Sequence, residues 1–276
     1  MLPLTSRIAV IGAGPAGLSA AMTLKERGFR DVTVLEKEPH VGGKCKSFTH
    51  GGRVYDLGAN LTTPRYRTIR ALAERMDMTL RKVADRRIVN LGTEEFASLA
   101  DANVLERLVV RGGASLYVKL RHLTGIDRHG YGGLRDAVEQ PFGVWLERHG
   151  LGKFRELFEV LFVAYGYGQM LELPAAYALK FFDRVHLDAS IDTVMGEDVP
   201  FTMDFVEGFQ ELWERVDLRL DIGTRRNATV EAVRRSPRGV EISWTEDGAA
   251  RSDRFDTLIV ACGLQDALAF LDTSED

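Results

Sequence analysis

The feature that most constrains this chain is a glycine-rich loop between a short apolar strand and a helix. Residues 7–11 form an apolar run that is typical of a buried parallel strand. The loop that follows reads Gly12-Ala13-Gly14-Pro15-Ala16-Gly17. Apolar spacing over residues 15–27 predicts a helix that Gly28 ends, and residues 31–36 predict a second strand. These segments together predict a right-handed βαβ unit.

Each glycine of the loop has a physical role in binding a dinucleotide. Gly12 allows a sharp turn after the strand, Gly14 lets the backbone approach a diphosphate, and Gly17 lets the helix pack against the sheet. The helix N-terminus presents N–H groups and the positive end of its dipole to the phosphates. Glu36 follows Gly17 by about 20 residues, where a carboxylate accepts hydrogen bonds from the adenosine ribose and disfavours the 2′-phosphate of NADP. The sequence therefore predicts a Rossmann-type cofactor site made by residues 12–17 and Glu36.

The loop alone does not separate FAD from NAD, but the blocks that follow carry a resemblance. Residues 36–44 resemble the second block of the flavin-containing amine oxidase superfamily, and residues 55–59 resemble the next block, which passes close to the isoalloxazine. Residues 229–233 resemble the strand that holds the adenine through its backbone. The resemblance implies FAD as the cofactor. It adds these cofactor-binding residues: Lys37, Gly43, Lys44, Gly58, Ala59 and Val230.

Two stretches in the middle of the chain are similar to a bacterial subgroup of this superfamily. Residues 165–168 read Tyr-Gly-Tyr-Gly, and residues 173–181 read Leu-Pro-Ala-Ala-Tyr-Ala-Leu-Lys-Phe. The subgroup contains polyunsaturated fatty acid double-bond isomerases and β-cyclopiazonate dehydrogenase-like proteins. The resemblance implies an FAD-dependent oxidoreductase that abstracts hydride from an organic, lipid-like small molecule, with an FAD-dependent isomerase as the alternative. Tyr165 and Tyr167 are cavity candidates, although core packing explains them as well.

The order of predicted elements indicates an α/β chain with an inserted helical region. We expect the first segment of a Rossmann-type FAD-binding domain over residues 1–75 and a mainly helical substrate domain over residues 76–200. Residues 201–276 are expected to complete the FAD-binding domain. The strand candidates in this last segment are Leu218–Ile222, Thr229–Val233, Val240–Trp244 and Phe255–Ala261.

The chain is shorter than the superfamily members it resembles. They return to the substrate domain after the strand near Cys262 and end with a further strand and helix beside the flavin. A truncated, non-catalytic FAD-binding protein is therefore a third hypothesis. A partner chain or an oligomer that completes the fold is the corresponding expectation.

Composition excludes several other classes of function. With 36 basic and 40 acidic residues, the net charge of -4 gives no electrostatic case for nucleic acid. Neither the two cysteines nor the six histidines have metal-ligand spacing, so no metal is expected. No apolar run reaches the length of a membrane span, and no signal peptide precedes residue 7, so the expected location is the cytoplasm. The residues do not identify a catalytic acid or base.

Overall fold

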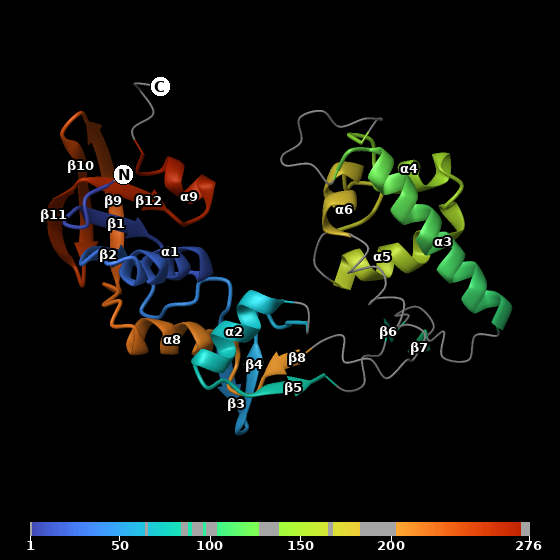
Figure 1. Cartoon of the computed structure of the whole chain (residues 1–276), viewed down its shortest axis with the longest axis horizontal. Helices are drawn as coiled ribbons and strands as arrows, with labels where there is room; N and C mark the ends of the chain where they lie inside the picture. Colours follow the sequence, from blue (N-terminus) through green and yellow to red (C-terminus); the bar gives the residue numbers. More distant parts are fainter. Residues whose placement is uncertain are drawn as a thin grey trace. The chain divides into compact units, whose positions relative to one another are not determined.

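The protein is described here from a computed structural model. The structure describes residues 2–63, 66–83, 88–89, 96–97, 104–126, 138–164, 168–182 and 203–271. The chain forms two compact units, one made of residues 1–82 and 202–276 and the other of residues 83–201 (Figure 1). The predicted fold class, a Rossmann-type domain with an inserted, mainly helical domain, is confirmed.

The first unit is built on a parallel sheet of three strands. Its order is β12-β1-β2, so the N-terminal βαβ unit pairs with a strand from the far end of the chain. The elements of this sheet and its helices are β1 (Arg7–Ile11), α1 (Pro15–Glu26), β2 (Asp31–Leu35), α8 (Phe209–Arg219), β12 (Thr257–Val260) and α9 (Leu264–Leu268). The other elements of the unit are β3 (Ser47–His50), β4 (Arg53–Asp56), α2 (Arg67–Arg75), β5 (Leu80–Lys82), β8 (Met203–Phe205), β9 (Ala228–Ser236), β10 (Gly239–Glu246) and β11 (Ala249–Phe255).

Strand β1 is apolar from Ile8 to Ile11 because this part of it is covered on both faces. Ile8 and Val10 pack into a core shared with helices α1, α2 and α8. Ala9 and Ile11 point the other way, into a core shared with the antiparallel sheet β11-β10-β9. Alternate residues of one strand thus serve two cores, which explains why its sequence shows no polar alternation.

The second unit has an aromatic core of its own. Tyr117, Phe142, Trp145, Phe162 and Phe182 are fully buried in it. Its described elements are β6 (Ile88–Val89), β7 (Phe96–Ala97), α3 (Val104–Leu123), α4 (Phe142–Arg148), the 3₁₀ turn η1 (Gly152–Phe154), α5 (Arg155–Ala164) and α6 (Ala175–Phe181). Tyr165 and Tyr167, the predicted cavity candidates, lie outside the described residues.

Two strand predictions in the last segment are wrong. Leu218–Ile222 is not a strand, because helix α8 continues to Arg219 and a turn follows it, with Asp221 at a φ of 47°. Phe255–Ala261 is not one strand. The chain leaves the antiparallel sheet after Phe255 and enters the parallel sheet at Thr257. Asp256 marks the change of sheet, where its carboxylate accepts a hydrogen bond from the backbone N–H of Arg7 at 2.8 Å.

Candidate dinucleotide-binding site

The predicted phosphate loop connects β1 to α1 and leaves the start of the helix open. Gly12 has a φ of 101°, and its N–H donates to Leu35 O of strand β2 at 2.8 Å. Gly14 is the N-cap residue, and no side chain among the described residues caps this helix. Pro15, which lacks an N–H, occupies the first helical position. The helix N-terminus is therefore available to an anionic group.

The packing around the loop distinguishes two of its glycines. A Cβ at Gly17 would lie 1.8 Å from the carbonyl oxygen of Gly12, so no larger residue fits there without moving the backbone. A Cβ at Gly14 would meet only Gly43 Cα, at 3.8 Å, which is an ordinary van der Waals contact. Gly17 is thus required by the protein's own packing, whereas Gly14 faces open space.

Glu36 is a buried carboxylate that is tied to the phosphate loop. Its side chain is 7% exposed. One carboxylate oxygen accepts a hydrogen bond from Ala13 N–H at 2.7 Å, and the other accepts one from Glu38 N–H at 3.0 Å. Each oxygen retains a further lone pair that a ribose hydroxyl could use. The acid therefore points toward the loop.

A second glycine loop packs against the first. Gly42 N–H donates to Ala13 O at 2.9 Å, and Gly43 has a φ of 52°. A Cβ at Gly43 would lie 3.1 Å from Gly14 Cα, so the two loops are as close as backbone allows. Lys44, the next residue, is exposed. The structure thus brings Gly43 and Lys44 to the N-terminus of α1.

The other predicted cofactor residues extend this site along the chain. Ala59 N–H donates to Lys44 O at 2.9 Å, and a Cβ at Gly58 would lie 1.9 Å from the same oxygen. Val230 lies in β9, which begins beside β2, where Ala228 N–H donates to Glu36 O at 2.8 Å. Lys37 is exposed, and its ammonium lies 3.5 Å from a carboxylate oxygen of Asp266 in α9.

A clamp that the sequence did not predict holds the β3–β4 hairpin on helix α8. The Asp56 carboxylate accepts a hydrogen bond from Phe209 N–H at 2.9 Å, and Ser47 Oγ accepts one from Gln210 N–H at 3.1 Å. In the other direction, the side-chain oxygen of Gln210 accepts a hydrogen bond from Ser47 N–H at 2.9 Å. The first two N–H groups of α8 are thus capped by residues from a distant hairpin.

The signal that could have revealed this clamp is the residue before the helix. Gly208 is the N-cap, and it offers no side chain to cap α8. Two features require glycine at position 208. Its φ is 89°, and a Cβ there would lie only 2.7 Å from Ser47 Oγ. A helix that starts without a local cap needs an acceptor from elsewhere in the fold.

Replacing Asp56 should loosen the hairpin that connects Lys44 to Gly58. We expect Asp56→Ala to lower the free energy of unfolding by about 0.5–2 kcal/mol, the usual cost of a lost N-cap. Asp56→Asn keeps an acceptor oxygen and should recover most of this loss. Thermal unfolding measures both, with Thr49→Ala, on the exposed part of the same hairpin, as the control. Equal melting temperatures for Asp56→Ala and the control would contradict the clamp.

Both cysteines lie near the loops, and their surroundings keep them as thiols. Burial raises the pKa of Cys45 to about 11, and burial also raises the pKa of the half-buried Cys262. Because only the thiolate is strongly nucleophilic, we expect slow alkylation of both at neutral pH, with Cys262 modified well before Cys45. Mass spectrometry after iodoacetamide treatment, with and without urea, measures the order. Equally fast modification of Cys45 in the native protein would refute this expectation.

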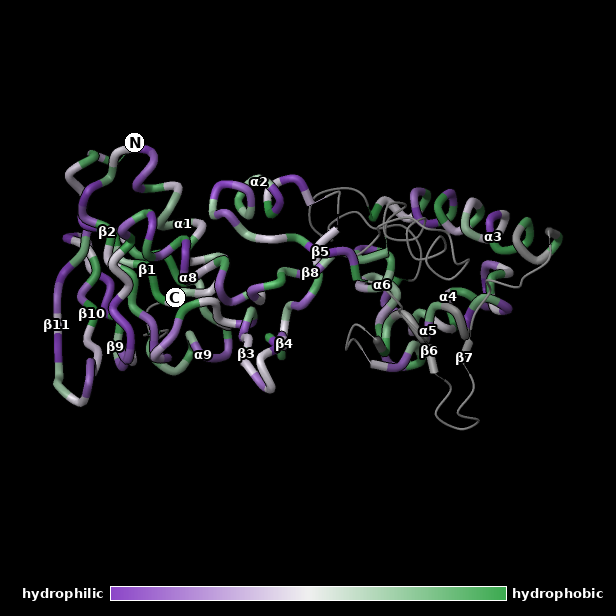
Figure 2. Tube along the Cα trace, turned by 90° about the horizontal axis from the view of Figure 1, so that it is seen from below, coloured by the Kyte–Doolittle hydropathy of each residue, from purple (hydrophilic) through white to green (hydrophobic). Residues whose placement is uncertain are grey.

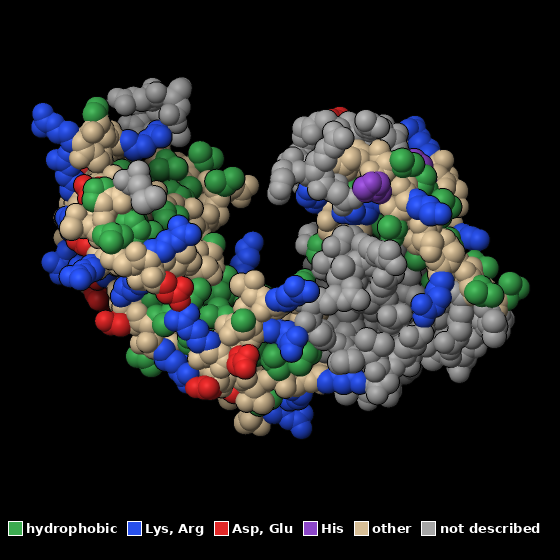
Figure 3. Space-filling model, in the orientation of Figure 1, with side chains coloured by type: hydrophobic (Ala, Val, Ile, Leu, Met, Phe, Trp, Pro, Cys, Tyr) green, Lys and Arg blue, Asp and Glu red, His purple; other side chains and the backbone are tan. Residues whose placement is uncertain are grey.

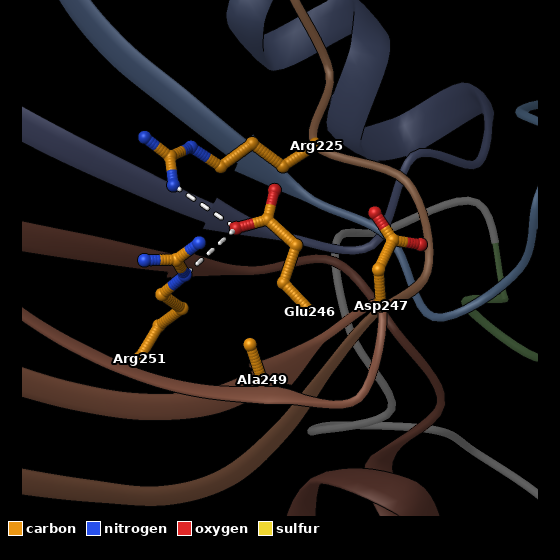
Figure 4. Close-up of a pocket in the computed structure, with 5 residues that line it drawn as sticks. All are labelled: Arg225, Glu246, Asp247, Ala249 and Arg251. Carbon is orange, nitrogen blue, oxygen red and sulfur yellow. Dashed lines mark hydrogen bonds and ion pairs between the residues drawn. The ribbon is translucent and has the colours of Figure 1, made fainter.

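A surface pocket of about 540 Å³ borders the end of strand β2, where Glu36 N–H donates to Arg225 O at 2.9 Å. Figure 4 shows its lining, Arg225, Glu246, Asp247, Ala249 and Arg251. The carboxylate of Glu246 lies between two guanidinium groups, 3.2 Å from that of Arg225 and 4.0 Å from that of Arg251. The charges of this pocket are thus largely matched within the protein. None of the predicted cofactor residues lines it.

The arrangement fits a dinucleotide. The ends of β1 and β2 bring together the glycines Gly14 and Gly43, the uncapped N-terminus of α1, and the buried carboxylate of Glu36. Among the described residues, no group of three or more His, Cys, Asp or Glu side chains could hold a metal ion. Among the helices that the structure describes, none is both long enough and apolar enough to cross a bilayer.

Comparison with known proteins connects this site to a family. The sequence matches the family described as flavin containing amine oxidoreductase over residues 15–271. Protoporphyrinogen oxidase 2 of Arabidopsis thaliana is 51% identical over 57 residues, which are 21% of this chain and 11% of that protein. The polyenoic fatty acid isomerase of Ptilota filicina is 42% identical over 59 residues, which are 21% of this chain and 12% of that protein.

Solved structures match over nearly the whole chain. The CLA-producing fatty acid isomerase from P. acnes superposes with a TM-score of 0.81 at 30% identity, over 99% of this chain and 62% of that one. A putrescine oxidase superposes with a TM-score of 0.75 at 20% identity, over 97% of this chain and 60% of that one, which shows a shared fold. The chain thus spans about three fifths of the length of these two solved structures. The stretch that matches the two curated relatives spans about a tenth of their length. The predicted superfamily and its cofactor, FAD, are confirmed. This chain belongs to the flavin containing amine oxidoreductase family.

Proposed function

We propose that the protein is an FAD-dependent oxidoreductase that takes hydride from a small organic substrate. The observation that carries the proposal is the contact between the buried Glu36 carboxylate and Ala13 N–H, beside an uncapped helix N-terminus. Family membership supports it. When bound, FAD supplies a flavin ring that accepts hydride from an activated C–H bond.

The protein's own contribution is to bind and orient the cofactor. In this proposal the loop from Gly12 to Gly17 holds the diphosphate with its backbone, and Glu36 accepts hydrogen bonds from the adenosine ribose. Gly43 permits close approach, and Lys44 places a positive charge near the phosphates. The remaining contacts belong to Lys37, Gly58, Ala59 and Val230, where backbone and small side chains lie against the flavin and the adenine.

The absorbance spectrum of the purified protein tests the proposal most directly. We expect a yellow protein with flavin absorbance, or a colourless one that becomes yellow when FAD is added and the excess is removed. Extraction and chromatography would identify the nucleotide. A protein that excludes FAD and retains NAD would refute the proposal.

A second candidate is a double-bond isomerase that acts on unsaturated fatty acids. It is supported by the match to the P. acnes isomerase, which covers 99% of this chain at 30% identity. Such a reaction returns hydride to a different carbon and needs no external oxidant. Anaerobic incubation of the FAD-loaded protein with polyunsaturated fatty acids tests it, and unchanged double-bond positions in every substrate would count against it.

The wider setting of the reaction stays a prediction. We infer a lipid-like substrate bound by the helical unit, a cytoplasmic location, and a partner chain or oligomer that completes the substrate cavity. Light scattering measures the oligomeric state of the purified protein, and a turnover assay on the same sample measures its activity. A monomer that converts substrate alone would exclude the partner chain or oligomer.

A further inference from the structure

The segment that joins helix α8 to strand β9 lies against the end of β2 and holds the backbone of Glu36. Arg225 O accepts a hydrogen bond from Glu36 N–H at 2.9 Å, and Ala228 N–H donates to Glu36 O at 2.8 Å. Arg226 lies between these two residues in the chain. Residues 223–227 read Gly-Thr-Arg-Arg-Asn, without an apolar side chain, whereas two cores hold the hydrophobic residues of β1 (Figure 2). The position of this segment therefore depends on hydrogen bonds and ion pairs.

The side chain of Arg226 attaches this segment to helix α8. Its Nη2 donates to a carboxylate oxygen of Glu214 at 2.7 Å and to one of Asp217 at 3.0 Å. The two acids are three positions apart on α8, so they are neighbours on one face, where like charges repel each other. The guanidinium between them offsets this repulsion. The other oxygen of Asp217 accepts a hydrogen bond from Thr224 Oγ1 at 2.6 Å, which holds the start of the same segment.

Glu214 connects Arg226 to the second glycine loop. Its other carboxylate oxygen accepts a hydrogen bond from Val41 N–H at 3.3 Å, and the Val41 side chain is fully buried. Gly42, the next residue, donates its N–H to Ala13 O in the phosphate loop. One guanidinium thus joins the segment that holds Glu36 to the loop that packs against the phosphate loop.

The burial of the two acids distinguishes this cluster from ordinary surface ion pairs. Figure 3 shows Lys or Arg side chains beside Asp or Glu side chains on the visible face of the first unit, and exposed pairs of this kind contribute little. The pair of Arg7 and Asp31 is an example, with side chains 41% and 45% exposed. The side chains of Glu214 and Asp217 are only 26% and 10% exposed. Water and salt therefore screen their interaction with Arg226 less.

We propose that Arg226 is a positioning residue of the cofactor site, which fixes the acid that faces the ribose relative to the glycine loop that faces the diphosphate. The inference rests on the proposed contacts of FAD with Glu36 and Gly43. Because one FAD molecule spans both groups, a site that holds them in place before binding has the higher affinity. Arg226 acts through Glu214 and through the backbone on either side of it.

Titration of the apoprotein with FAD, followed by flavin fluorescence, tests the proposal. We expect Arg226→Gln and Glu214→Gln each to lower the affinity for FAD about tenfold. The amide of Glu214→Gln has one acceptor oxygen, so it satisfies either Val41 N–H or Arg226, but not both. The double variant should bind FAD no more weakly than either single variant, because both changes break the same connection. Arg226→Lys keeps a cation between the acids and should recover most of the affinity.

Arg225→Gln is the matched control. It makes the same substitution one residue earlier and removes an ion pair with Glu246 at 3.2 Å, so FAD affinity should stay within about threefold of the wild type. Asp217→Asn separates positioning from stability, because it weakens the acid that does not reach the glycine loop. We expect a lower melting temperature with FAD affinity again within about threefold. A purely structural role of Arg226 predicts instead that affinity falls with the melting temperature in every variant.

The outcomes separate this inference from the proposed function. Wild-type FAD affinity in Glu214→Gln, additive losses in the double variant, or equal losses in Glu214→Gln and Asp217→Asn would overturn the role of Arg226 while FAD binding itself stands. If Arg226→Gln does not fold, Glu214→Gln and Arg226→Lys give the same comparison. A wild-type protein that binds no FAD would overturn the proposed function, and this inference with it.

Discussion

Gly17→Ala is expected to prevent the first unit from folding correctly. The new Cβ would lie 1.8 Å from Gly12 O, and this atom belongs to backbone that cannot rotate away. Helix α1 would have to move off strand β1, which disrupts the core around Leu18 and Ala21. We expect the free energy of unfolding to fall by at least about 3 kcal/mol, the upper part of the range for overpacking. Thermal unfolding and recovery of folded protein measure the effect.

Gly14→Ala is the matched comparison, because it adds the same methyl group three residues earlier. Gly14 has a φ of -74°, which alanine adopts readily, and the only atom near its Cβ would be Gly43 Cα at 3.8 Å. We expect stability within about 1 kcal/mol of the wild type. Affinity for FAD should nevertheless fall at least about tenfold, because the methyl occupies the side that the diphosphate approaches. Normal folding of Gly17→Ala, or wild-type FAD affinity in Gly14→Ala, would show that the roles are assigned wrongly.

Removal of the Glu36 carboxylate should have the second large effect. Glu36→Ala leaves the N–H groups of Ala13 and Glu38 without their acceptor. An unsatisfied buried group costs about 1–3 kcal/mol, and the charged bonds to the ribose would be lost as well. We expect a lower melting temperature and a loss of FAD affinity of about 10- to 100-fold. Titration of the apoprotein with FAD, followed by flavin fluorescence, measures the affinity.

Two further variants separate charge from size and position. Glu36→Gln keeps one acceptor oxygen and should give an intermediate affinity. Glu38→Ala changes an exposed carboxylate two residues away and should leave both stability and affinity near the wild type. Equal FAD affinity for Glu36→Ala and Glu38→Ala would refute the role assigned to Glu36.

The βαβ unit could be predicted because its information is local. The strand, the GxGxxG spacing, the helix and the acid at position 36 lie within one short stretch, and each glycine has its own steric reason. The contact from Glu36 to Ala13 follows once β2 pairs with β1. The clamp of Ser47 and Asp56 on helix α8 could not be predicted in the same way. Its partners are 153 and 163 residues apart in the chain, and no spacing rule connects them.

The errors in the last segment also have physical causes. Leu218, Leu220 and Ile222 alternate as in a strand, but a pattern over five residues also fits the end of a helix. Leu218 is in fact exposed on α8. Strand β11 was missed because its sequence, Ala-Ala-Arg-Ser-Asp-Arg-Phe, is polar on both faces. It is an edge strand whose pairing with β10 comes from backbone hydrogen bonds.

The pairing of β1 with β12 has a consequence for how the protein is made. Arg7 and Asp256, which are hydrogen-bonded at one end of this pair, are 249 positions apart. A ribosome that adds roughly 5–20 residues per second needs roughly 12–50 s to cover that distance. During this time β1 has no neighbour on its β12 side, and its apolar residues lack part of their final cover. We expect the nascent chain to need chaperone protection through this interval, while the helical unit, whose core is its own, can fold first.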